Sequence, residues 1–383
     1  MIYVIPIVLA ILGLLNNKGS TSKGAFLYWV TCISIILIFG LRYRVGGDTL
    51  NYMDRYEWLP ELKYLSFADL FIYNLEPGFV VLCGIAKQFF HSFYAVQIFE
   101  SCLANIAIFY YAKKKIGVNF LFVLLYFILL SFYFNTEIMR EGCAVAFFLL
   151  GLLQYEKGNI AKFYIWMIPA VFFHYSSLFL LLFPLLNKMM VTPKRLIVWG
   201  AVALILLNFM NLPVIGGYLG AKIEENSTYH FSIWGKLVVF LKYVVFPYAI
   251  LKFIKRNDSS EKSITIQNFL YVYMFFGILT IGPYSILMRL MNYLNPIFLI
   301  IVAYCFSKSF KFAPNTSFVR LSSLICLFVF YLSPYLGDTS HITRDTHFYC
   351  LWFPYHSIFD EQTDAKRETF VRAQFNELHE RSE

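Results

Sequence analysis

Charged residues are scarce in this sequence: Asp, Glu, Lys and Arg make up 14% of it, whereas hydrophobic residues make up 59% and aromatic residues 20%. The mean hydropathy is +0.62. Soluble domains devote about a quarter of their residues to charged side chains, so this composition argues against an ordinary soluble protein. Repeated long apolar runs indicate a polytopic membrane protein instead.

Motifs for several kinds of enzyme chemistry are missing as well. There is no Asp-x-Asp pair, no Gly-rich phosphate loop with its lysine, and no Gly-x-Ser-x-Gly turn. Their absence argues against sugar-nucleotide, ATP-driven and serine-hydrolase chemistry. The seven cysteines form no Cys-x-x-Cys pair, so we expect free thiols. His341, Asp345 and His347 fit no strong metal-ligand spacing, and we expect neither a metal nor another cofactor.

The apolar runs predict an all-α fold of about 10 to 12 transmembrane or re-entrant helices, because roughly 20 apolar residues cross a bilayer as a helix. We assign residues 1–335 to one polytopic membrane domain and residues 336–383 to a polar C-terminal tail. No internal repeat supports a duplicated transporter architecture. The first run lacks a basic leader and a small-residue cleavage site, so we expect a retained helix. The runs fall near 2–15, 25–41, 94–112, 117–134, 138–154, 160–187, 194–212, 236–254, 265–281, 286–306 and 317–333.

The net charge of +9 comes from basic residues in short loops between the apolar runs. Because they do not cover one soluble face, they argue against nucleic-acid binding and are typical of cytoplasmic loops under the positive-inside rule. Lys113-Lys114-Lys115 is the densest of these clusters. The opposite loops then lie outside the cytoplasm and carry acids, arginines and tyrosines, so we expect the chemistry there. These loops are 43–77, 135–138, 212–235 and 282–285.

Two apolar runs do not fit a simple crossing. The run 78–90 is short and contains Lys87 and Gln88, which predicts a re-entrant or half-length helix. The run 160–187 lies between two lysine-rich ends, which favours a hairpin that turns near His174; the alternative is one long tilted span. In the tail, Phe370, Val371, Phe375 and Leu378 have a helical spacing, so we expect the tail to lie on the membrane surface.

Charged residues at the predicted outer ends of the helices are the candidate site. Charge is costly inside a bilayer, so such residues usually handle a charged ligand or anchor a helix. The first set is Arg42, Arg44 and Asp48 with Tyr52, next to a flexible Gly46-Gly47 pair. A positively charged helix flank with a tight turn is the alternative for this set.

Three further sets follow along the chain. Glu137, Arg140 and Glu141 stand at helical spacing, which fits either a ligand site or a simple ion pair within one helix. His174, with Tyr175 and Ser176, either accepts a proton from a hydroxyl, donates to a phosphate oxygen, or is a structural histidine. Arg289 with Asn292 and Tyr293 is either a third site component or an arginine that extends toward the interface.

These residues together carry a resemblance to a known family. The chain is similar to the EpsG family of Wzy-like bacterial membrane proteins, along nearly its whole length. One departure is Glu141, where the family often has glutamine. The motifs that carry the resemblance are the Arg-Tyr-Arg-Val-Gly-Gly-Asp-Thr-x-x-Tyr stretch at 42–52, Glu76-Pro77, Met139-Arg140-Glu141-Gly142, Phe173-His174-Tyr175-Ser176, Arg289 and Pro354-Tyr355-His356-Ser357-Ile358-Phe359.

The resemblance implies a GT-C-like glycosyltransferase in the bacterial inner membrane. It would polymerise undecaprenyl-pyrophosphate-linked oligosaccharides into exopolysaccharide, capsule or O-antigen at the outer face. A chain-length regulator and a flippase of the same pathway are the expected protein partners, beside the lipid bilayer. Because the leaving group is a diphosphate, it needs cations more than protonation, and arginine binds two phosphate oxygens at once.

We therefore expect Arg44, Arg140 and Arg289 to share one pocket, with Asp48 or His174 as the base that makes the transfer inverting. Three other classes remain open: a lipid-linked oligosaccharide flippase, an O-antigen ligase and a glycan acyltransferase. The residues expected to bind substrate are Arg42, Tyr52, Glu76, Glu137, Glu141, Tyr175, Asn292 and Tyr293.

Overall fold

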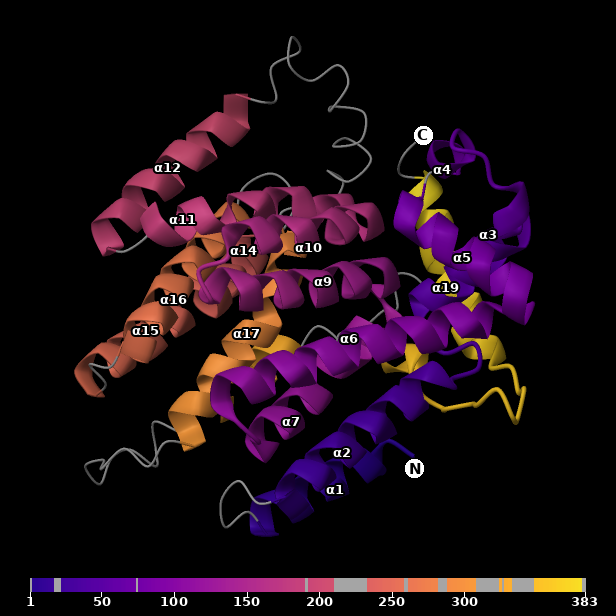
Figure 1. Ribbon diagram of the computed structural model, residues 1–383, viewed down its shortest axis with the longest axis horizontal. Coiled ribbons are helices and arrows are strands. Elements are labelled where there is room, and N and C mark those ends of the chain that lie inside the picture. Colours follow the sequence, from indigo (N-terminus) through magenta and orange to yellow (C-terminus); the bar gives the residue numbers. More distant parts are fainter. Residues whose placement is uncertain are drawn as a thin grey trace. The chain divides into compact units, whose positions relative to one another are not determined.

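The structure is a computed structural model of the chain. Every regular element that it describes is a helix, which confirms the all-α prediction (Figure 1). Most of the predicted loop 212–235, the turn at 282–285 and His341, Asp345 and His347 lie outside the described residues. The structure describes residues 2–16, 22–73, 75–189, 192–209, 233–257, 261–281, 288–307, 324–325, 327–332 and 348–380.

Four of the described helices are long and apolar enough to cross a membrane: Ser22–Gly40, Phe93–Ile116, Ile233–Arg256 and Met288–Ser307. Several shorter apolar helices accompany them, so the chain is a polytopic membrane protein. The chain divides into two compact units. The first comprises Met1–Ser177 and Ser322–Glu380, and the second contains Leu178–Leu321.

The first unit contains the residues that carry most of the predicted site. Within it α9 packs on α6 and α10, α2 packs on α6, and α1 packs on α2 and α7. Its helices are α1 (Val4–Asn16), α2 (Ser22–Gly40), α3 (Gly47–Trp58), η1 (Leu62–Tyr64), α4 (Asp69–Ile72), α5 (Pro77–Phe90), α6 (Phe93–Ile116), α7 (Phe120–Tyr126), the π-helical η2 (Phe127–Ser131), α8 (Phe132–Thr136), α9 (Met139–Glu156), α10 (Ile160–Phe173), η7 (Phe348–Leu351) and α19 (Ala365–Glu380).

The second unit is built from a second group of helices around α16, which packs on α11, α12, α15 and α17. Tyr273 of α16 donates a hydrogen bond to Asn295 of α17 at 2.9 Å, so a buried polar pair joins these two helices. The 3₁₀ helix η3 (Tyr175–Leu182) leads into this unit from the first. Its helices are α11 (Phe183–Met189), α12 (Pro193–Phe209), α14 (Ile233–Phe240), the π-helical η4 (Leu241–Val245), α15 (Phe246–Asn257), α16 (Glu261–Leu279) and α17 (Met288–Ser307).

Buried polar side chains hold the long helices of the first unit together. Asn105 of α6 donates to Asn135 of α8 at 2.7 Å, and Tyr126 of α7 donates to Asn105 at 2.8 Å. Ser101 donates to the same Asn135 oxygen at 3.2 Å. Such hydrogen bonds between helices are a common means of association where the surroundings offer no water. Asn135 therefore has a structural role in helix packing.

The prediction of a half-length helix is confirmed. Helix α5 has 14 residues, which corresponds to about 21 Å and falls short of a bilayer crossing of about 30 Å. The polar residues at its end bind the preceding loop: Lys87 donates to the carbonyls of Tyr56, Glu57 and Leu59, and Gln88 accepts from the amide of Lys63. Lys87 and Gln88 thus interrupt the apolar run because their side chains bind backbone groups of the segment before α5.

The run 160–187 is also interrupted where the sequence indicates a turn. Helix α10 ends at Phe173, and His174 has an extended backbone with φ −159° and ψ 120°. Its amide still donates to the carbonyl of Ala170 at 2.9 Å, so α10 closes with its last turn satisfied. The chain then continues as a 3₁₀ helix. The segment is therefore not one continuous helix, and the hairpin stays a prediction. The break leaves the imidazole of His174 at a helix end.

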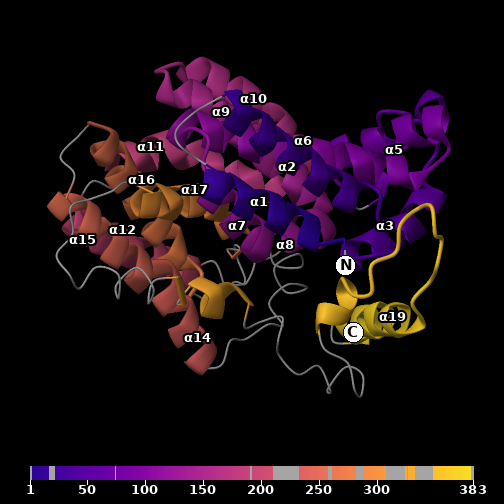
Figure 2. The same ribbon diagram turned by 90° about the horizontal axis from the view of Figure 1, so that it is seen from below.

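The C-terminal tail docks on the loop that follows α2. Backbone hydrogen bonds join Tyr43 to His356, Gly46 to Leu351 and Ile358 to Leu41, at 2.8 to 2.9 Å. The expectation that the apolar face of the tail lies on the membrane surface is wrong for Phe370 and Val371. Both side chains are buried in a small core with Leu50, Leu351 and Trp352. Tyr3, which precedes α1, donates to the carbonyl of Trp352, so the N-terminal segment is joined to the residue that follows η7. Helix α19 lies beside α3 (Figure 2).

Candidate active site

Helices α3 and α9 cap each other. The residues that precede them, Gly46 and Ile138, provide no side-chain cap. Instead, the amide of Gly47 donates to Glu137 Oε1 at 3.0 Å, and the amide of Met139 donates to Asp48 Oδ2 at 3.2 Å. Carboxylates are favoured at helix N-termini because the first amides are unpaired and the helix dipole is positive there. This reciprocal cap joins the start of α3 to the start of α9.

The geometry corrects one expectation about the second residue set. Glu137 lies before α9, at the C-terminal end of α8, so it does not share a helical face with Glu141. It does not form the ion pair with Arg140 that was the alternative to a ligand site, because its carboxylate binds Gly47 and Thr136. Arg140 pairs with a residue far away in the sequence instead.

Gly46 makes the reciprocal cap possible, because its φ is 100° and a Cβ there would lie 2.5 Å from the Cβ of Thr136. We expect Gly46→Ala to lower the melting temperature of the detergent-purified protein by more than Gly117→Ala. Both positions have positive φ, which costs about 1 to 2 kcal/mol for a side chain. Only Gly46 lacks space, since nothing lies within 4 Å of a Cβ at Gly117. Equal losses in the two variants would show that contact with Thr136 is unimportant.

Arg140 lies at the centre of a buried charged cluster at this end of α9. Its Nε donates to Tyr52 OH at 2.7 Å, its guanidinium lies 5.0 Å from the centre of the Tyr52 ring, and its Nη1 forms an ion pair with Glu76 Oε2. The other Glu76 oxygen is 2.6 Å from His174 Nδ1. Glu141 Oε2 lies 3.8 Å from His174 Nε2. We call these five residues the Arg140 cluster.

Glu76 connects the cation and the imidazole of the Arg140 cluster. Burial raises the pKa of this carboxyl, but the hydrogen bond with His174 and the charge of Arg140 outweigh it and lower the pKa to about 2. Glu76 is therefore ionised at any physiological pH. Only 6% of its side chain is exposed, compared with 18% for Arg140. Removing one partner of such a buried pair is costly, because the other charge stays in a poorly solvated place.

Glu137 has the opposite electrostatic behaviour. Burial, and then the negative charge of Asp48, raise the pKa of this carboxyl to about 7. The two carboxylates of the reciprocal cap therefore repel each other when both are ionised. A proton on Glu137 relieves this repulsion in the folded state.

The raised pKa of Glu137 gives a pH-dependent contribution to stability. Below about pH 4.5 the carboxyl is protonated in both the folded and the unfolded chain; between pH 4.5 and about 7 only the folded protein retains this proton. Stability that is present at low pH is therefore lost as the pH rises through 7. We expect Glu137→Gln, which keeps the oxygen that binds Gly47, to remove this loss. Thermal unfolding between pH 5 and 8 tests this, and parallel curves for both proteins would contradict it.

The structure gives the arginines of the first set their own partners. Arg42 is fully buried and donates to the carbonyls of Phe39 and Val45 and to the hydroxyl of Thr49. Arg44, with φ 51°, pairs with Glu368 of α19 at 2.6 Å. Both guanidinium groups thus organise the loop and the tail that covers it. Their roles in substrate binding and catalysis stay predictions.

Arg289, Asn292 and Tyr293 lie in the first turns of α17, in the second unit. Arg289 is exposed, whereas Asn292 and Tyr293 are buried. Their participation in one site with Arg140 stays a prediction. Tyr175 follows His174 directly and is exposed. Within the described parts of the chain, no group of three His, Cys, Asp or Glu residues is placed to hold a metal ion.

The sequence analysis missed three buried charged or amide residues near these helix ends. Glu100 of α6 is fully buried, and no described group hydrogen bonds to either oxygen. The sequence could have identified Glu100, because it lies inside an apolar run, where a charged residue is costly. Gln97, one turn earlier, donates to the carbonyls of Gly40 and Arg42. Arg367 had no signal, because it belongs to a charged tail and becomes buried only when α19 docks.

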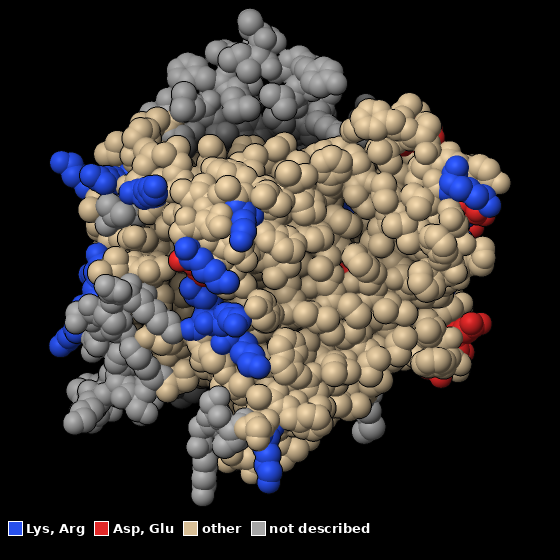
Figure 3. Space-filling view, in the orientation of Figure 1, with Lys and Arg blue, Asp and Glu red and all other residues tan. Residues whose placement is uncertain are grey.

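The Arg140 cluster and the Lys113-Lys114-Lys115 cluster lie at opposite ends of the same group of helices. Lys115, at the end of α6, pairs with Glu156, at the end of α9, at 2.7 Å. Arg140 lies in the first turn of α9, about 24 Å away along an ideal helix of this length. Figure 3 shows Lys and Arg gathered around the end of α6 and a broad surface almost without charge beside them. This arrangement fits a membrane protein whose site and basic loops are on opposite sides.

The fold and the site define a polytopic, all-helical membrane protein with a buried arginine, glutamate and histidine cluster at one end of its helices. A model of the EpsG family matches residues 25–357, and the chain therefore belongs to the EpsG family. This match confirms the resemblance and includes every residue of the Arg140 cluster. No curated protein and no solved structure matches the chain.

Proposed function

We propose that this protein is a Wzy-like polysaccharide polymerase, which joins oligosaccharide units carried on undecaprenyl pyrophosphate at the outer face of the bacterial inner membrane. The observation that carries the proposal is the Arg140 cluster, because it places a cation beside an oriented imidazole at the end of α9 opposite the lysines. Membership of the EpsG family supports the same reaction class. The products would be exopolysaccharide, capsule or O-antigen.

In this reaction the hydroxyl of an acceptor sugar attacks the anomeric carbon of the donor glycan. The bond between that carbon and the diphosphate oxygen breaks, and the electron pair leaves with the polyprenyl diphosphate. Among the described residues Arg140 Nη2 has no hydrogen-bond partner, since Nε binds Tyr52 and Nη1 binds Glu76. This nitrogen is the group that we assign to a diphosphate oxygen, where it would stabilise the charge that develops there.

His174 is our choice for the base that takes the proton of the acceptor hydroxyl. Glu76 holds Nδ1 of the ring, so Nε2 is the nitrogen that we assign to the proton of the acceptor hydroxyl. Glu141, 3.8 Å away, would stabilise the imidazolium that forms. Asp48 is the less favoured base, because its carboxylate caps α9. Arg44 and Arg289 remain proposed contributors to diphosphate binding.

The test is reconstitution of the purified protein with a synthetic undecaprenyl-pyrophosphate oligosaccharide. We expect glycans of two or more repeat units and release of undecaprenyl pyrophosphate in equal amounts. Glycan that stays one unit long, under conditions where the protein is folded, would overturn the proposal. His174→Gln and Asp48→Asn distinguish the two bases, because only loss of the base abolishes elongation while the protein remains folded.

Complementation of a null strain separates the other three classes. A polymerase defect leaves single repeat units on their final acceptor, whereas a flippase defect traps lipid-linked units inside the cell. An acyltransferase defect leaves the chain length unchanged. A ligase defect leaves long chains on the lipid carrier. Gel analysis of the glycans from the His174→Gln strain therefore identifies the class.

A further inference from the structure

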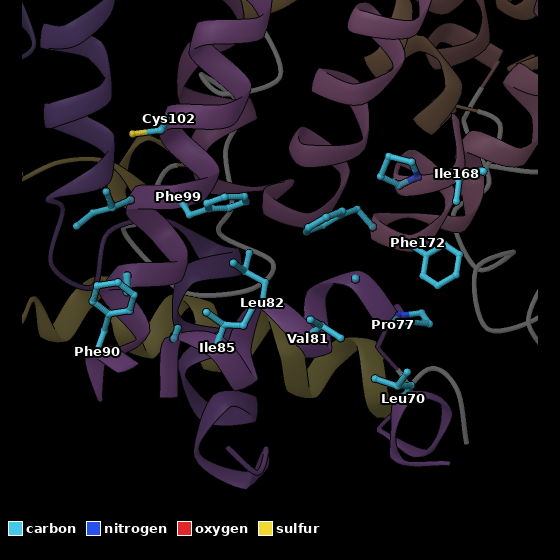
Figure 4. A pocket seen from close by; sticks show the side chains of 16 residues that line it. Leu70, Pro77, Val81, Leu82, Ile85, Phe90, Phe99, Cys102, Ile168 and Phe172 are labelled. Atoms are coloured by element: carbon cyan, nitrogen blue, oxygen red, sulfur yellow. The ribbon is translucent and has the colours of Figure 1, made fainter. Parts of the chain in front are cut away.

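A large apolar cavity lies beside the Arg140 cluster. Its volume is about 850 Å³, near the upper end of the range of about 300 to 1,000 Å³ for small-molecule sites. No charged residue is among its lining residues. In Figure 4, Phe99 and Cys102 of α6 lie on one side, Ile168 and Phe172 of α10 on the other, and Val81, Leu82 and Ile85 of α5 between them.

One end of the cavity lies next to the Arg140 cluster, because two of its lining residues directly neighbour residues of that cluster. Pro77 lines the cavity and follows Glu76, and Phe173 lines it and precedes His174. At this end α5 and α10 approach closely, since a Cβ on Gly78 would lie 2.9 Å from the carbonyl oxygen of Phe172. Farther along, the two helices leave the cavity between them. An apolar chain inside it would therefore end close to the Arg140 cluster.

The cavity exists because two of its three helices are interrupted. Helix α5 is too short to cross the bilayer, and α10 contains Pro169 and ends at Phe173. Only α6 continues over a full membrane thickness. Phe90 and Phe172 line the cavity and are largely exposed, which leaves a side of it accessible from the surface of the first unit. A membrane-dissolved ligand can thus enter from the bilayer.

We propose that this cavity holds the first isoprene units of a polyprenyl diphosphate, whose head group reaches Arg140. The inference rests on the proposed function and extends it to a defined tail site. A polyprenyl diphosphate fits the observations because it combines one long apolar chain with an anionic head, matching an uncharged cavity that ends beside a partly exposed guanidinium. The diphosphate supplies the negative charge that Arg140 Nη2 can bind.

Photolabelling of the purified full-length protein in detergent tests this proposal. The probe is geranylgeranyl diphosphate with a diazirine on its chain, and the labelled peptides are mapped by mass spectrometry. We expect the label on residues of α5, α6 and α10 that line the cavity. Unlabelled undecaprenyl phosphate should compete well, and the uncharged polyprenol should compete less. A phosphatidylglycerol probe with the same diazirine is the bilayer-lipid arm, and it should not label these residues above background.

Two cavity-filling variants and one matched control complete the experiment. Ala95→Phe and Val81→Phe place a ring in the cavity without altering the Arg140 cluster, and each should reduce the labelling roughly 5-fold or more. Ile106→Phe adds the same ring on α6 at a position that is 47% exposed and does not line the cavity, so labelling should be unchanged. Size-exclusion chromatography shows whether each variant is folded.

Each result either supports or overturns the inference. Label outside the cavity, equal label from phosphatidylglycerol, or no effect of both folded variants would overturn it. Because labelling requires no turnover, it separates the two proposals. Labelling of the cavity without polymer formation would support the isoprenoid site and contradict the proposed polymerase activity. Polymer formation with the label elsewhere would remove only the tail site.

Discussion

Arg140→Ala is expected to reduce glycan elongation at least about 100-fold, the usual scale for removing one group that stabilises developing negative charge in a transition state. The substitution removes the guanidinium that we assign to the diphosphate. It also leaves Glu76 buried with one partner fewer, because the ion pair through Nη1 is lost. The measurement is the initial rate of undecaprenyl pyrophosphate release by the reconstituted protein, normalised to folded protein.

Arg140→Lys distinguishes the role of the guanidinium in diphosphate binding from its role as a positive charge beside Glu76. Lysine keeps a cation beside Glu76 but cannot bind Tyr52, Glu76 and a phosphate oxygen in the planar arrangement of a guanidinium. We expect this variant to fold normally and to recover only a small part of the rate. Arg372→Ala is the matched control, since Arg372 is exposed on α19. Wild-type rates for Arg140→Lys would contradict the assignment of Arg140 Nη2 to a diphosphate oxygen.

The membrane fold could be predicted because its determinants are local. The length and polarity of each apolar run decide whether a helix crosses the bilayer, and both are read directly from the chain. The interruptions were predictable for the same reason. Lys87 and Gln88 lie in the last turn of α5, and α10 ends before the polar residues that follow Phe173. These features require no knowledge of which helices are neighbours.

The contacts of the candidate site could be predicted only in part, because they join residues far apart in the sequence. Spacing along one helix suggested that Arg140 pairs with Glu137, but the start of α9 excludes Glu137 from that helix. Its place is taken by Glu76, which the half-length helix α5 presents from a different part of the chain. Local spacing cannot reveal such a pair, because it depends on how α5 packs on α10 and how α10 packs on α9.

The same limit applies to the tail. A charged segment such as 360–383 favours an exposed helix when it is considered alone, yet its Arg367 is only 1% exposed. The carbonyls of Arg44, Cys350 and Pro354 face this segment, and such groups need partners once they are buried. At least one charged side chain of the tail, Arg367, therefore serves to donate hydrogen bonds to backbone carbonyls. This role becomes visible only when both segments are placed together.

Arg367→Ala is therefore expected to be the most destabilising substitution in the tail. Arg367 donates to the carbonyls of Cys350, Arg44 and Pro354. Its loss leaves three carbonyls without this donor, at about 1 to 3 kcal/mol for each buried group that stays unpaired. We expect most of the protein to aggregate or be degraded, as measured by fluorescence-detected size-exclusion chromatography of membrane extracts. Arg372→Ala should leave the profile unchanged, because its side chain is exposed on the same helix. A monodisperse Arg367→Ala protein with wild-type thermal stability would show that the docked tail does not depend on this guanidinium.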